Sequence, residues 1–183
     1  MNEFIKSIKR KYSFLEYDPD WPRQFSLIKS FLEDVFGDMT VRIEHIGSTS
    51  IPKMKAKPVI DVLVVVEKME LFEKQKEKMV EAGYEWLENY IAPDSLIFYK
   101  LGPEGEKLEN IHILEGKALK ARQFIVMRDY LRTHPEKAKA YSEVKQKGFD
   151  LHPDDYPAYR DVKTPFLKEL ESIAYEWDDQ KNK

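Results

Sequence analysis

The sequence predicts a single α+β domain in which a mixed β-sheet is followed by a C-terminal helical cap. Segments with the alternation or the apolar runs of strands lie between residues 39 and 114, whereas the later chain shows only helical spacing. No linker or repeat divides the 183 residues. We therefore expect one domain over 1–183, with a core from about 14 to 177, a sheet half over about 20–116 and a helical half over about 117–177.

The sheet half begins with a helix expected at 21–36. Phe25, Ile28 and Leu32 recur there at helical spacing, and Gly37 follows as a stop signal. Strands are expected at 39–46, 57–66, 84–88, 96–101 and 108–114, with a charged surface helix at 69–82. The second strand is almost wholly apolar, as in strands buried on both faces, and a Gly-Pro turn joins the last two strands as a hairpin.

The helical half is expected to hold four helices, at 119–133, 136–148, 155–163 and 165–177. Thr164 is placed as the N-cap of the last helix and Pro165 in its first turn. Phe166, Leu170 and Ile173 then form one apolar stripe. These helices are predicted to pack as a cap on the sheet.

Composition limits the classes of partner. The chain has 30 Lys and Arg against 33 Asp and Glu, so its net charge of -3 gives no general attraction to nucleic acid or anionic membranes. The absence of cysteine excludes disulfides and thiolate metal sites. No apolar stretch approaches the roughly 20 residues that span a bilayer, and no signal peptide is recognisable. We expect a cytoplasmic protein whose affinity for anions is local.

Four small residues after the first strand form a candidate phosphate site. Gly47, Ser48, Thr49 and Ser50 let backbone N–H groups approach an anion, and the three hydroxyls add donors. The alternative is that this segment forms only a turn.

A lone carboxylate follows inside the second apolar run. Asp61 is costly to bury without compensation, so we expect it to face a cation or a cluster of donors. Mg²⁺ commonly takes one or two carboxylates and substrate phosphate, which makes Asp61 the candidate catalytic and metal-binding residue. The alternative is a structural carboxylate that pairs with Lys57 or caps a loop.

These segments resemble the opening of the nucleotidyltransferase fold and, more narrowly, the GrpB family, also called UPF0157. The matching segments are 45–52, 56–58, 60–61, 17–19 with Trp21, 83–84, 111–113, 128–132, 134–135, and Tyr141 with Lys145. The resemblance spans about residues 14–168. It implies a Gly-Ser turn that holds phosphate and acids on the next strand that hold a divalent metal.

One position departs from the nucleotidyltransferase pattern. Active members usually carry a second acid two residues after the first, where its side chain returns to the same strand face, and this chain has Leu63 there. Half of the metal clamp is therefore missing, and two-metal transfer in its usual form is not expected. Some GrpB relatives are fused to dephospho-coenzyme A kinase, which implies a link with nucleotide or coenzyme metabolism.

Two histidines offer another set of ligands. His45 and His112 each alternate with isoleucines in strand-like segments, and with Asp61 they could converge on Zn²⁺, Mn²⁺ or Fe²⁺ if the strands are neighbours. The alternatives are hydrogen-bonded structural histidines or groups that transfer protons. Mg²⁺ or Mn²⁺ is the preferred expected metal, and Zn²⁺ is less favoured.

The helical half supplies cations. Arg128 and Arg132 share one helix face and suit phosphate, as does Lys57 beside the turn, so all three join the predicted phosphate site. Tyr141 with Lys145, and Lys163 with the tyrosine four residues earlier, could stack a base while the ammonium meets phosphate, which makes them candidates for substrate binding. The alternative is that these side chains cover the core with solvated heads.

Three functions follow from these residues. The first is a nucleotidyltransferase-like protein that binds a phosphorylated small molecule, with a nucleotide preferred, and transfers a nucleotidyl or phosphoryl group with a metal. The second is a catalytically silent nucleotide- or anion-binding module, which Leu63 favours. The third is a histidine-metal hydrolase, which requires His45 and His112 to meet.

Overall fold

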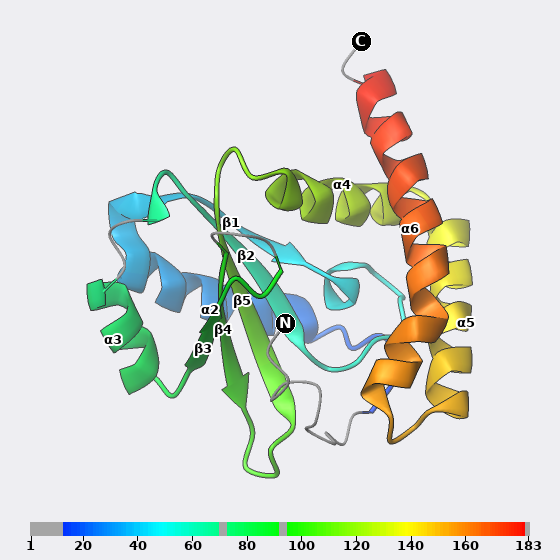
Figure 1. The fold of residues 1–183 in the computed structure, drawn as a ribbon, viewed down its shortest axis with the longest axis horizontal. Coiled ribbons are helices and arrows are strands. Elements are labelled where there is room, and N and C mark those ends of the chain that lie inside the picture. The colour runs from blue at the N-terminus through cyan, green and yellow to red at the C-terminus, as the bar shows by residue number, and fades with distance from the viewer. Residues whose placement is uncertain (1–12, 70–72, 92–94, 182–183) are drawn as a thin grey trace.

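A five-stranded mixed sheet forms the centre of the computed structural model, which describes residues 13–69, 73–91 and 95–181 (Figure 1). The strands are β1 (Thr40–Ile46), β2 (Ile60–Val66), β3 (Glu85–Glu88), β4 (Leu96–Leu101) and β5 (Lys107–Glu115), in the order β1-β2-β5-β4-β3. β2 and β5 are parallel, and the other neighbouring pairs are antiparallel. The predicted α+β class and mixed sheet are confirmed.

The register of the central strands decides which side chains share a face. His45 pairs with Val62, whereas Leu63 pairs with His112 and Asp61 with Asn110. Paired residues project from the same face and successive residues from opposite faces. His45 therefore lies on one face, and Asp61, Asn110 and His112 lie on the other.

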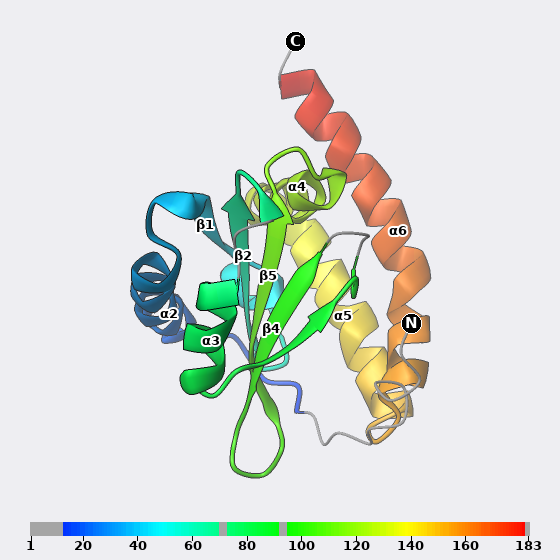
Figure 2. The same cartoon turned by 60° about the vertical axis from the view of Figure 1, so that its left-hand side comes forward.

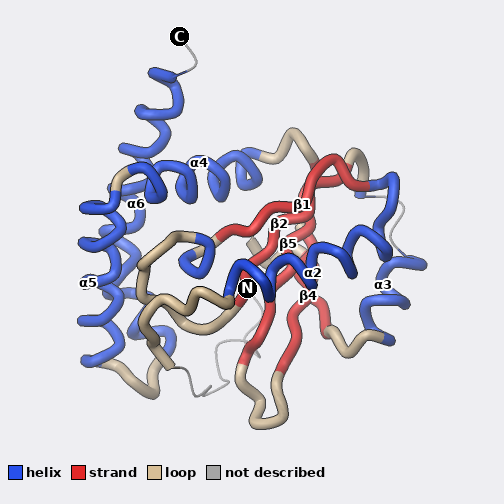
Figure 3. The backbone as a smooth tube through the Cα atoms, turned by 180° about the vertical axis from the view of Figure 1, so that it is seen from behind, coloured by secondary structure: helices blue, strands red, loops and turns tan. Residues whose placement is uncertain are grey.

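The face that carries His45 is covered by α2 (Trp21–Phe36), which crosses the sheet in Figure 3, and by α3 (Glu73–Glu81) beside it (Figure 2). The apolar spacing of α2 buries Trp21, Leu32 and Phe36 against alternate residues of β2 such as Val62 and Val64. A short 3₁₀ turn, η1 (Gly37–Met39), leads into β1. This layer is the larger part of the core.

The opposite face is covered in part by α4 (Leu119–Thr133). Ala121 packs with Leu63, Val65 and Leu114, and Phe124 extends this contact. Helices α5 (Pro135–Leu151) and α6 (Tyr156–Lys181) lie side by side beyond the end of β1, and they form the predicted cap (Figures 1 and 3). The cap has its own apolar core, which also takes in Ile51 and Met54 of the loop between β1 and β2.

The expected break between the last two helices is wrong. α6 runs continuously through Pro165, and Thr164 is not an N-cap, because its hydroxyl donates to the carbonyl of Arg160 at 2.8 Å. A proline inside a helix costs about 3 kcal/mol through the lost N–H and a steric clash. Burial of Tyr159 before the proline and of Leu170 after it offsets that cost, since both lie on the side that faces the rest of the cap.

Smaller differences concern the ends of elements. β2 begins at Ile60 and not at residue 57, because a tight turn in which the Val59 amide donates to the Lys57 carbonyl at 2.8 Å precedes it. The helix expected at 69–82 is observed as α3, and residues 70–72 of that range lie outside the described part. Within the described ranges, no helix combines the length and the apolar character needed to cross a membrane.

Leu170→Ala should test the packing of α6 as one element. Loss of this buried side chain should lower the free energy of unfolding by about 2 to 5 kcal/mol, as for other buried leucines. Leu151→Ala is the matched control, since Leu151 at the end of α5 is 58% exposed, and it should change that value by less than about 1 kcal/mol. Urea unfolding measures both, and equal small effects would contradict the packing described.

Candidate anion-binding site

The turn after β1 brings Gly47 against the strand that carries Asp61. Gly47 has φ of 71°, a backbone conformation that side chains with a Cβ rarely adopt. A Cβ at this position would lie 2.5 Å from Asp61 Oδ2. The glycine is therefore required by its dihedral angle and by the carboxylate beside it. A short 3₁₀ turn, η2 (Ser48–Ser50), follows directly.

Two of the three hydroxyls in the turn stabilise the turn itself. Ser50 Oγ donates to the Gly47 carbonyl at 2.6 Å, and Thr49 Oγ1 donates to the Val59 carbonyl at 3.2 Å. Both side chains are buried. Ser48 differs, because it is partly exposed and its hydroxyl meets the side chain of Lys145. Of the predicted hydroxyl donors, Ser48 is the one placed to reach a ligand.

Asp61 lies beside two polar residues of β5. Asn110 Nδ2 donates to Asp61 Oδ1 at 2.7 Å, and His112 Nε2 is 3.7 Å from the same oxygen. Burial raises the pKa of Asp61, but the His112 ring, the Asn110 amide and the charge of Lys57 outweigh it and hold that pKa below its ordinary value. The Asp61 side chain keeps 28% of its surface exposed. It is thus an ionised carboxylate that solvent can reach.

Lys145 of α5 is buried against this turn. Its side chain is 3% exposed, and Nζ donates to Ser48 Oγ at 2.9 Å and to the Lys55 carbonyl at 2.7 Å. Burial, and then the charges of Lys163 and Lys57, hold the pKa of Lys145 well below its ordinary value. In the described part of the chain no carboxylate pairs with this amine.

Two further lysines complete the group. Lys57 Nζ lies 4.0 Å from the ring centre of Tyr156, and Lys163 Nζ lies 5.6 Å from the ring centre of Tyr159. Lys57 Nζ is also 5.6 Å from the ring centre of Tyr159, so both ammonium groups lie beside the same ring. The five residues Ser48, Lys57, Asp61, Lys145 and Lys163 are called the lysine–aspartate cluster below. The sequence predicted these five residues for a phosphate, metal or substrate site, and that role stays a prediction.

Tyr141, a predicted substrate-binding residue, packs among other aromatic side chains. It is buried in the core of the cap, where it stacks on Phe166 with ring centres 6.0 Å apart. Burial, with the nearby Tyr156, Glu171 and Asp61, raises its pKa. Its ring lies 4.8 Å from Lys145 Nζ, so Tyr141 forms part of the wall around that amine.

Arg128 is engaged within the protein. Its guanidinium donates to Asp129 Oδ1 at 2.7 Å, to Glu44 Oε2 at 2.5 Å and to the His45 carbonyl at 3.2 Å, and the side chain is 8% exposed. Two carboxylates compensate its charge, and its expected role in phosphate binding stays a prediction. Arg128 ties α4 to β1.

Arg132 opens on a different part of the surface. Its Nε donates to the Ser50 carbonyl at 3.0 Å, and the side chain lines a hollow of about 580 Å³ between α4, α5 and residues 51–55. Lys53, Lys55 and Lys139 also line this hollow. The two arginines are therefore not gathered with Lys145 as expected.

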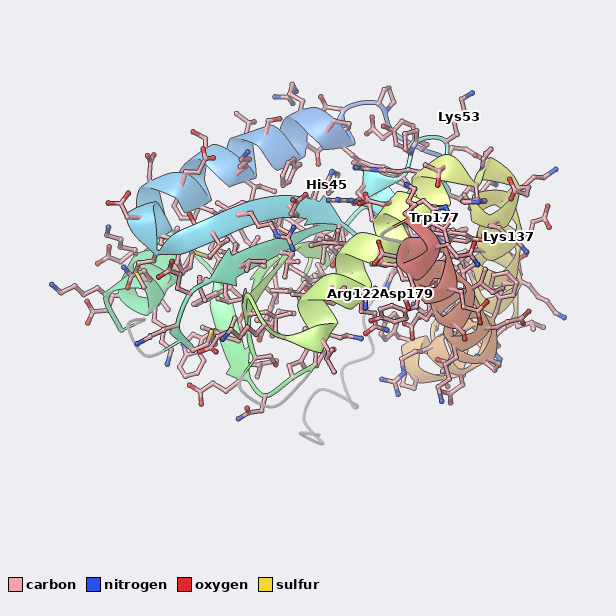
Figure 4. The ribbon with its side chains drawn as sticks, turned by 90° about the horizontal axis from the view of Figure 1, so that it is seen from above. His45, Lys53, Arg122, Lys137, Trp177 and Asp179 are labelled. Carbon is pink, nitrogen blue, oxygen red and sulfur yellow. The ribbon has the colours of Figure 1, made fainter. Side chains whose placement is uncertain are left out.

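The predicted convergence of His45, His112 and Asp61 is wrong. His45 lies between α2 and the sheet, as Figure 4 shows, where it stacks on Phe25 with ring centres 4.8 Å apart and Nε2 is 3.1 Å from Thr49 Oγ1. His112 lies on the other face, against Phe124. Among the described residues, no three His, Cys, Asp or Glu side chains form a group that could hold a metal.

Sequence reasoning missed Asn110 and placed Leu63 correctly. Asn110 follows no recognisable pattern, and only the parallel register of β2 and β5 places its amide on Asp61. Leu63 shares the face of Asp61, as expected two residues later, and it is fully buried under α4. The position at which nucleotidyltransferases usually carry a second acid is therefore occupied by an apolar core residue.

Fold and cluster together define an α+β protein in which a serine, a carboxylate and three lysines meet between a mixed sheet and its helical cap. The chain belongs to the GrpB family, because the GrpB protein family matches residues 11–172.

Individual relatives agree with this assignment. UPF0157 protein YqkA of Bacillus subtilis is 36% identical over 95% of this chain, which spans only 50% of YqkA. Glutamate-rich protein GrpB of Alkalihalophilus pseudofirmus is 32% identical over 88% of this chain and 95% of that protein. The crystal structure of conserved protein GrpB from Enterococcus faecalis has a TM-score of 0.83 at 30% identity, and it covers 90% of this chain and 98% of that one.

Longer proteins with another name also match. Dephospho-CoA kinase of Mycolicibacterium paratuberculosis is 27% identical over 88% of this chain, which spans 46% of the kinase. The chain therefore spans about half the length of some of the relatives that it resembles.

Gly47→Ala should show how tightly the turn is held against Asp61. The added methyl would meet Asp61 Oδ2 and would also be strained by the positive φ. Gly105→Ala is the matched control, because Gly105 has φ of 79° and open space around it. Gly47→Ala should lower the unfolding free energy by at least ~1 kcal/mol more than Gly105→Ala. If chemical denaturation shows equal losses of unfolding free energy for the two variants, the contact with Asp61 does not explain the effect of Gly47→Ala.

His45 should make stability depend on pH. Burial lowers its pKa to about 4, with Asp61 opposing this shift and Arg132 and Arg128 adding to it. The unfolded chain, with a histidine pKa near 6.5, binds the proton first as the pH falls, so the folded state loses stability between pH 6.5 and 4. The loss from this residue amounts to about 3 kcal/mol.

Urea unfolding at several pH values measures this loss. His45→Gln should remove that part of the fall in unfolding free energy, whereas His152→Gln, in the loop before α6, should leave it unchanged. The same fall in His45→Gln as in the parent protein would assign the pH dependence to other groups.

Proposed function

We propose that this chain binds a phosphorylated small molecule of the nucleotide class at the lysine–aspartate cluster. The observation that carries the proposal is the buried amine of Lys145, which is held against Ser48 while Lys57 and Lys163 direct their charges to the same place. Lys57 and Lys163 place two positive charges beside the one carboxylate of Asp61, so the cluster attracts anions even where Lys145 is neutral. Phosphate is an anion that lysine binds as a point charge and that a serine hydroxyl can also contact.

A tyrosine beside the lysines supports a nucleotide as the ligand. Tyr156 is partly exposed, and it stacks on the buried Tyr159 with ring centres 5.7 Å apart. Lys57 already lies over the Tyr156 ring. A base can stack on such an aromatic face while the neighbouring ammonium binds phosphate.

The donor set beside the cluster fits a divalent cation that is shared with phosphate. Asn110 Oδ1 is buried and has no hydrogen-bond partner in the described part of the chain, and a half-turn of the amide would aim it where Nδ2 now meets Asp61. A carboxylate, an amide oxygen and ligand phosphates are oxygen donors of the kind that Mg²⁺ or Mn²⁺ takes. Asp61 and Asn110 would hold the ion, which would neutralise phosphate charge.

Binding without ordinary transfer is the favoured form of this function. The buried Leu63 fills the place of the second acid, so a second metal lacks its carboxylate. Relatives named dephospho-CoA kinase support a connection with nucleotides or coenzymes, although that name belongs to proteins about twice as long as the matched part. Metal-dependent nucleotidyl or phosphoryl transfer is the second candidate, and Asp61 in its ionised form supports it.

Calorimetric titration with ATP, with and without Mg²⁺, tests the proposal. Ser48→Ala and Lys163→Met should each weaken ATP binding by about 1 to 3 kcal/mol, because a charged hydrogen bond or a charge near the phosphates is lost. Asp61→Asn should remove the part of the affinity that depends on Mg²⁺. Lys147→Met is the control, since Lys147 is exposed on the same helix as Lys145.

Two outcomes of these titrations would contradict the proposed binding of a nucleotide. If ATP, ADP and pyrophosphate neither bind nor raise the unfolding temperature with Mg²⁺ present, the phosphate ligand is excluded. Binding that Lys147→Met weakens as much as Lys163→Met would place the ligand elsewhere on the surface.

A further inference from the structure

We propose that Ser48 is a nucleophile and Lys145 its general base, so that Ser48 Oγ accepts a nucleotidyl group from a bound nucleoside triphosphate. The inference rests on the nucleotide binding proposed above and names a covalent step at the same cluster. Its basis is the contact between Lys145 Nζ and Ser48 Oγ at 2.9 Å, in a place where the amine has no acidic partner among the described residues.

The surroundings of Lys145 favour its neutral amine. The side chain is buried, and the charged groups that face it are the cations Lys57 and Lys163. Rings of Tyr141 on α5 and Phe14 on the N-terminal segment lie 4.8 and 5.4 Å from Nζ and form two walls around it. Desolvation and like charges both disfavour an ammonium, which is how proteins prepare lysine to act as a base.

The hydrogen bonds suit a neutral amine. An ammonium has three N–H donors and no lone pair, whereas the neutral amine has two donors and one acceptor site. One N–H can donate to the Lys55 carbonyl at 2.7 Å, and the lone pair can accept the Ser48 hydroxyl proton along the 2.9 Å contact. A nucleophile within hydrogen-bond reach of a buried base is the arrangement that activates serine.

The hydroxyl of Ser48 is also the one that can react. The side chain is partly exposed, whereas Thr49 and Ser50 are buried and their hydroxyls are bound to backbone carbonyls. Gly47 keeps the backbone before Ser48 free of a side chain on the Asp61 side. Ser48 Oγ thus meets its base and solvent together.

The proposed step is balanced. Ser48 Oγ bonds to the α-phosphorus of the triphosphate, and the bond from that phosphorus to the bridging oxygen breaks with its electron pair leaving on pyrophosphate. The Ser48 proton passes to Lys145 Nζ. Lys57 and Lys163 stand where they can stabilise the charge that grows on pyrophosphate, a task that the absent second metal would otherwise perform.

An anionic phosphorus centre suits this site better than a neutral acyl group. Lys57 and Lys163 place two positive charges beside the single carboxylate of Asp61, so a further anion is favoured there. A triphosphate supplies that anion, whereas an ester does not. The lysines therefore favour phosphorus as the electrophile for Ser48.

The first experiment tests the serine without nucleotide. A fluorophosphonate probe should label Ser48 in the full chain, as read by peptide mass spectrometry. Lys145→Arg keeps a cation that cannot give up its proton, so it should label at least about 100-fold more slowly, the lower range for loss of a general base. Lys145→Met should be labelled as slowly as Lys145→Arg. Ser142→Ala and Lys147→Met, on the same helix, should label like the parent protein.

The second experiment uses ATP with Mg²⁺. Intact-protein mass spectrometry should show one added adenylyl group on Ser48, which is absent in Ser48→Ala and strongly reduced in Lys145→Arg. The labelling rate of the parent protein should rise with pH around a midpoint below that of an ordinary lysine, and Lys145→Arg should lack this step. Circular dichroism verifies that each variant is folded.

The outcomes separate the two proposals. ATP binding by calorimetry, with neither fluorophosphonate labelling nor an adenylyl adduct at Ser48, would overturn the covalent step and leave the binding function in place. Labelling of Ser48 that Lys145→Arg and Lys145→Met leave unchanged would overturn Lys145 as its base. Probe labelling that depends on Lys145, in a protein that binds no ATP, would overturn the nucleotidyl step and the binding function together.

Discussion

The hydrogen bonds from Lys145 to Ser48 and to the Lys55 carbonyl join the helical cap to the sheet, and the candidate site depends on them. They fix the loop between β1 and β2, which also packs on the cap through Ile51 and Met54. Because this loop begins at Gly47, its position also decides what lies beside Asp61. A buried amine with no carboxylate partner among the described residues weakens a fold unless other polar groups contact it, and here the Ser48 hydroxyl and the Lys55 carbonyl do so.

A second attachment fixes the same loop from the other side of the sheet edge. Arg128 joins α4 to Glu44 and to the His45 carbonyl, and Arg132 binds the Ser50 carbonyl. α4 thereby holds the end of β1 and Ser50 of the turn, whereas α5 holds Ser48 of the same turn. These arginines position the turn from the side, and the lysines meet it where Ser48 is exposed. That division explains why similar cations on neighbouring helices have different roles.

Much of the fold follows from local patterns in the sequence. The five strands were predictable because an apolar run or an alternation marks each of them, and Gly37 marks the end of α2. The break predicted at Pro165 is wrong because local preference gave way to packing, since α6 buries residues on both sides of the proline. Helix propensity accounts for the destabilisation by a proline within a helix, but it does not include the tertiary contacts that offset it.

The site was predictable only where neighbours in sequence decide it. The small residues of the turn and the lone Asp61 were recognisable because each is unusual in its own segment. The separation of His45 from His112 depends on strand register, and a one-residue change of register would exchange faces. Asn110 and the engagement of Arg128 by Glu44 depend in the same way on contacts between distant segments. The chemistry of each residue was enough to propose it for a site, but the sequence could not show on which face of the sheet its side chain lies.

The burial of Leu63 links the fold to the chemistry available at the cluster. A second carboxylate at this position would lie among Val65, Leu114 and Ala121 under α4, where ionisation without compensation costs several kcal/mol. The helix that covers this face thus occupies the position at which a two-metal site would be completed. Positive charge beside Asp61 comes from Lys57 in the loop before β2, and Lys163 of α6 adds a second positive charge near Lys145. The same packing that stabilises α4 on the sheet therefore buries position 63, whereas Asp61 at the start of β2 and Ser48 in the turn after β1 stay partly exposed.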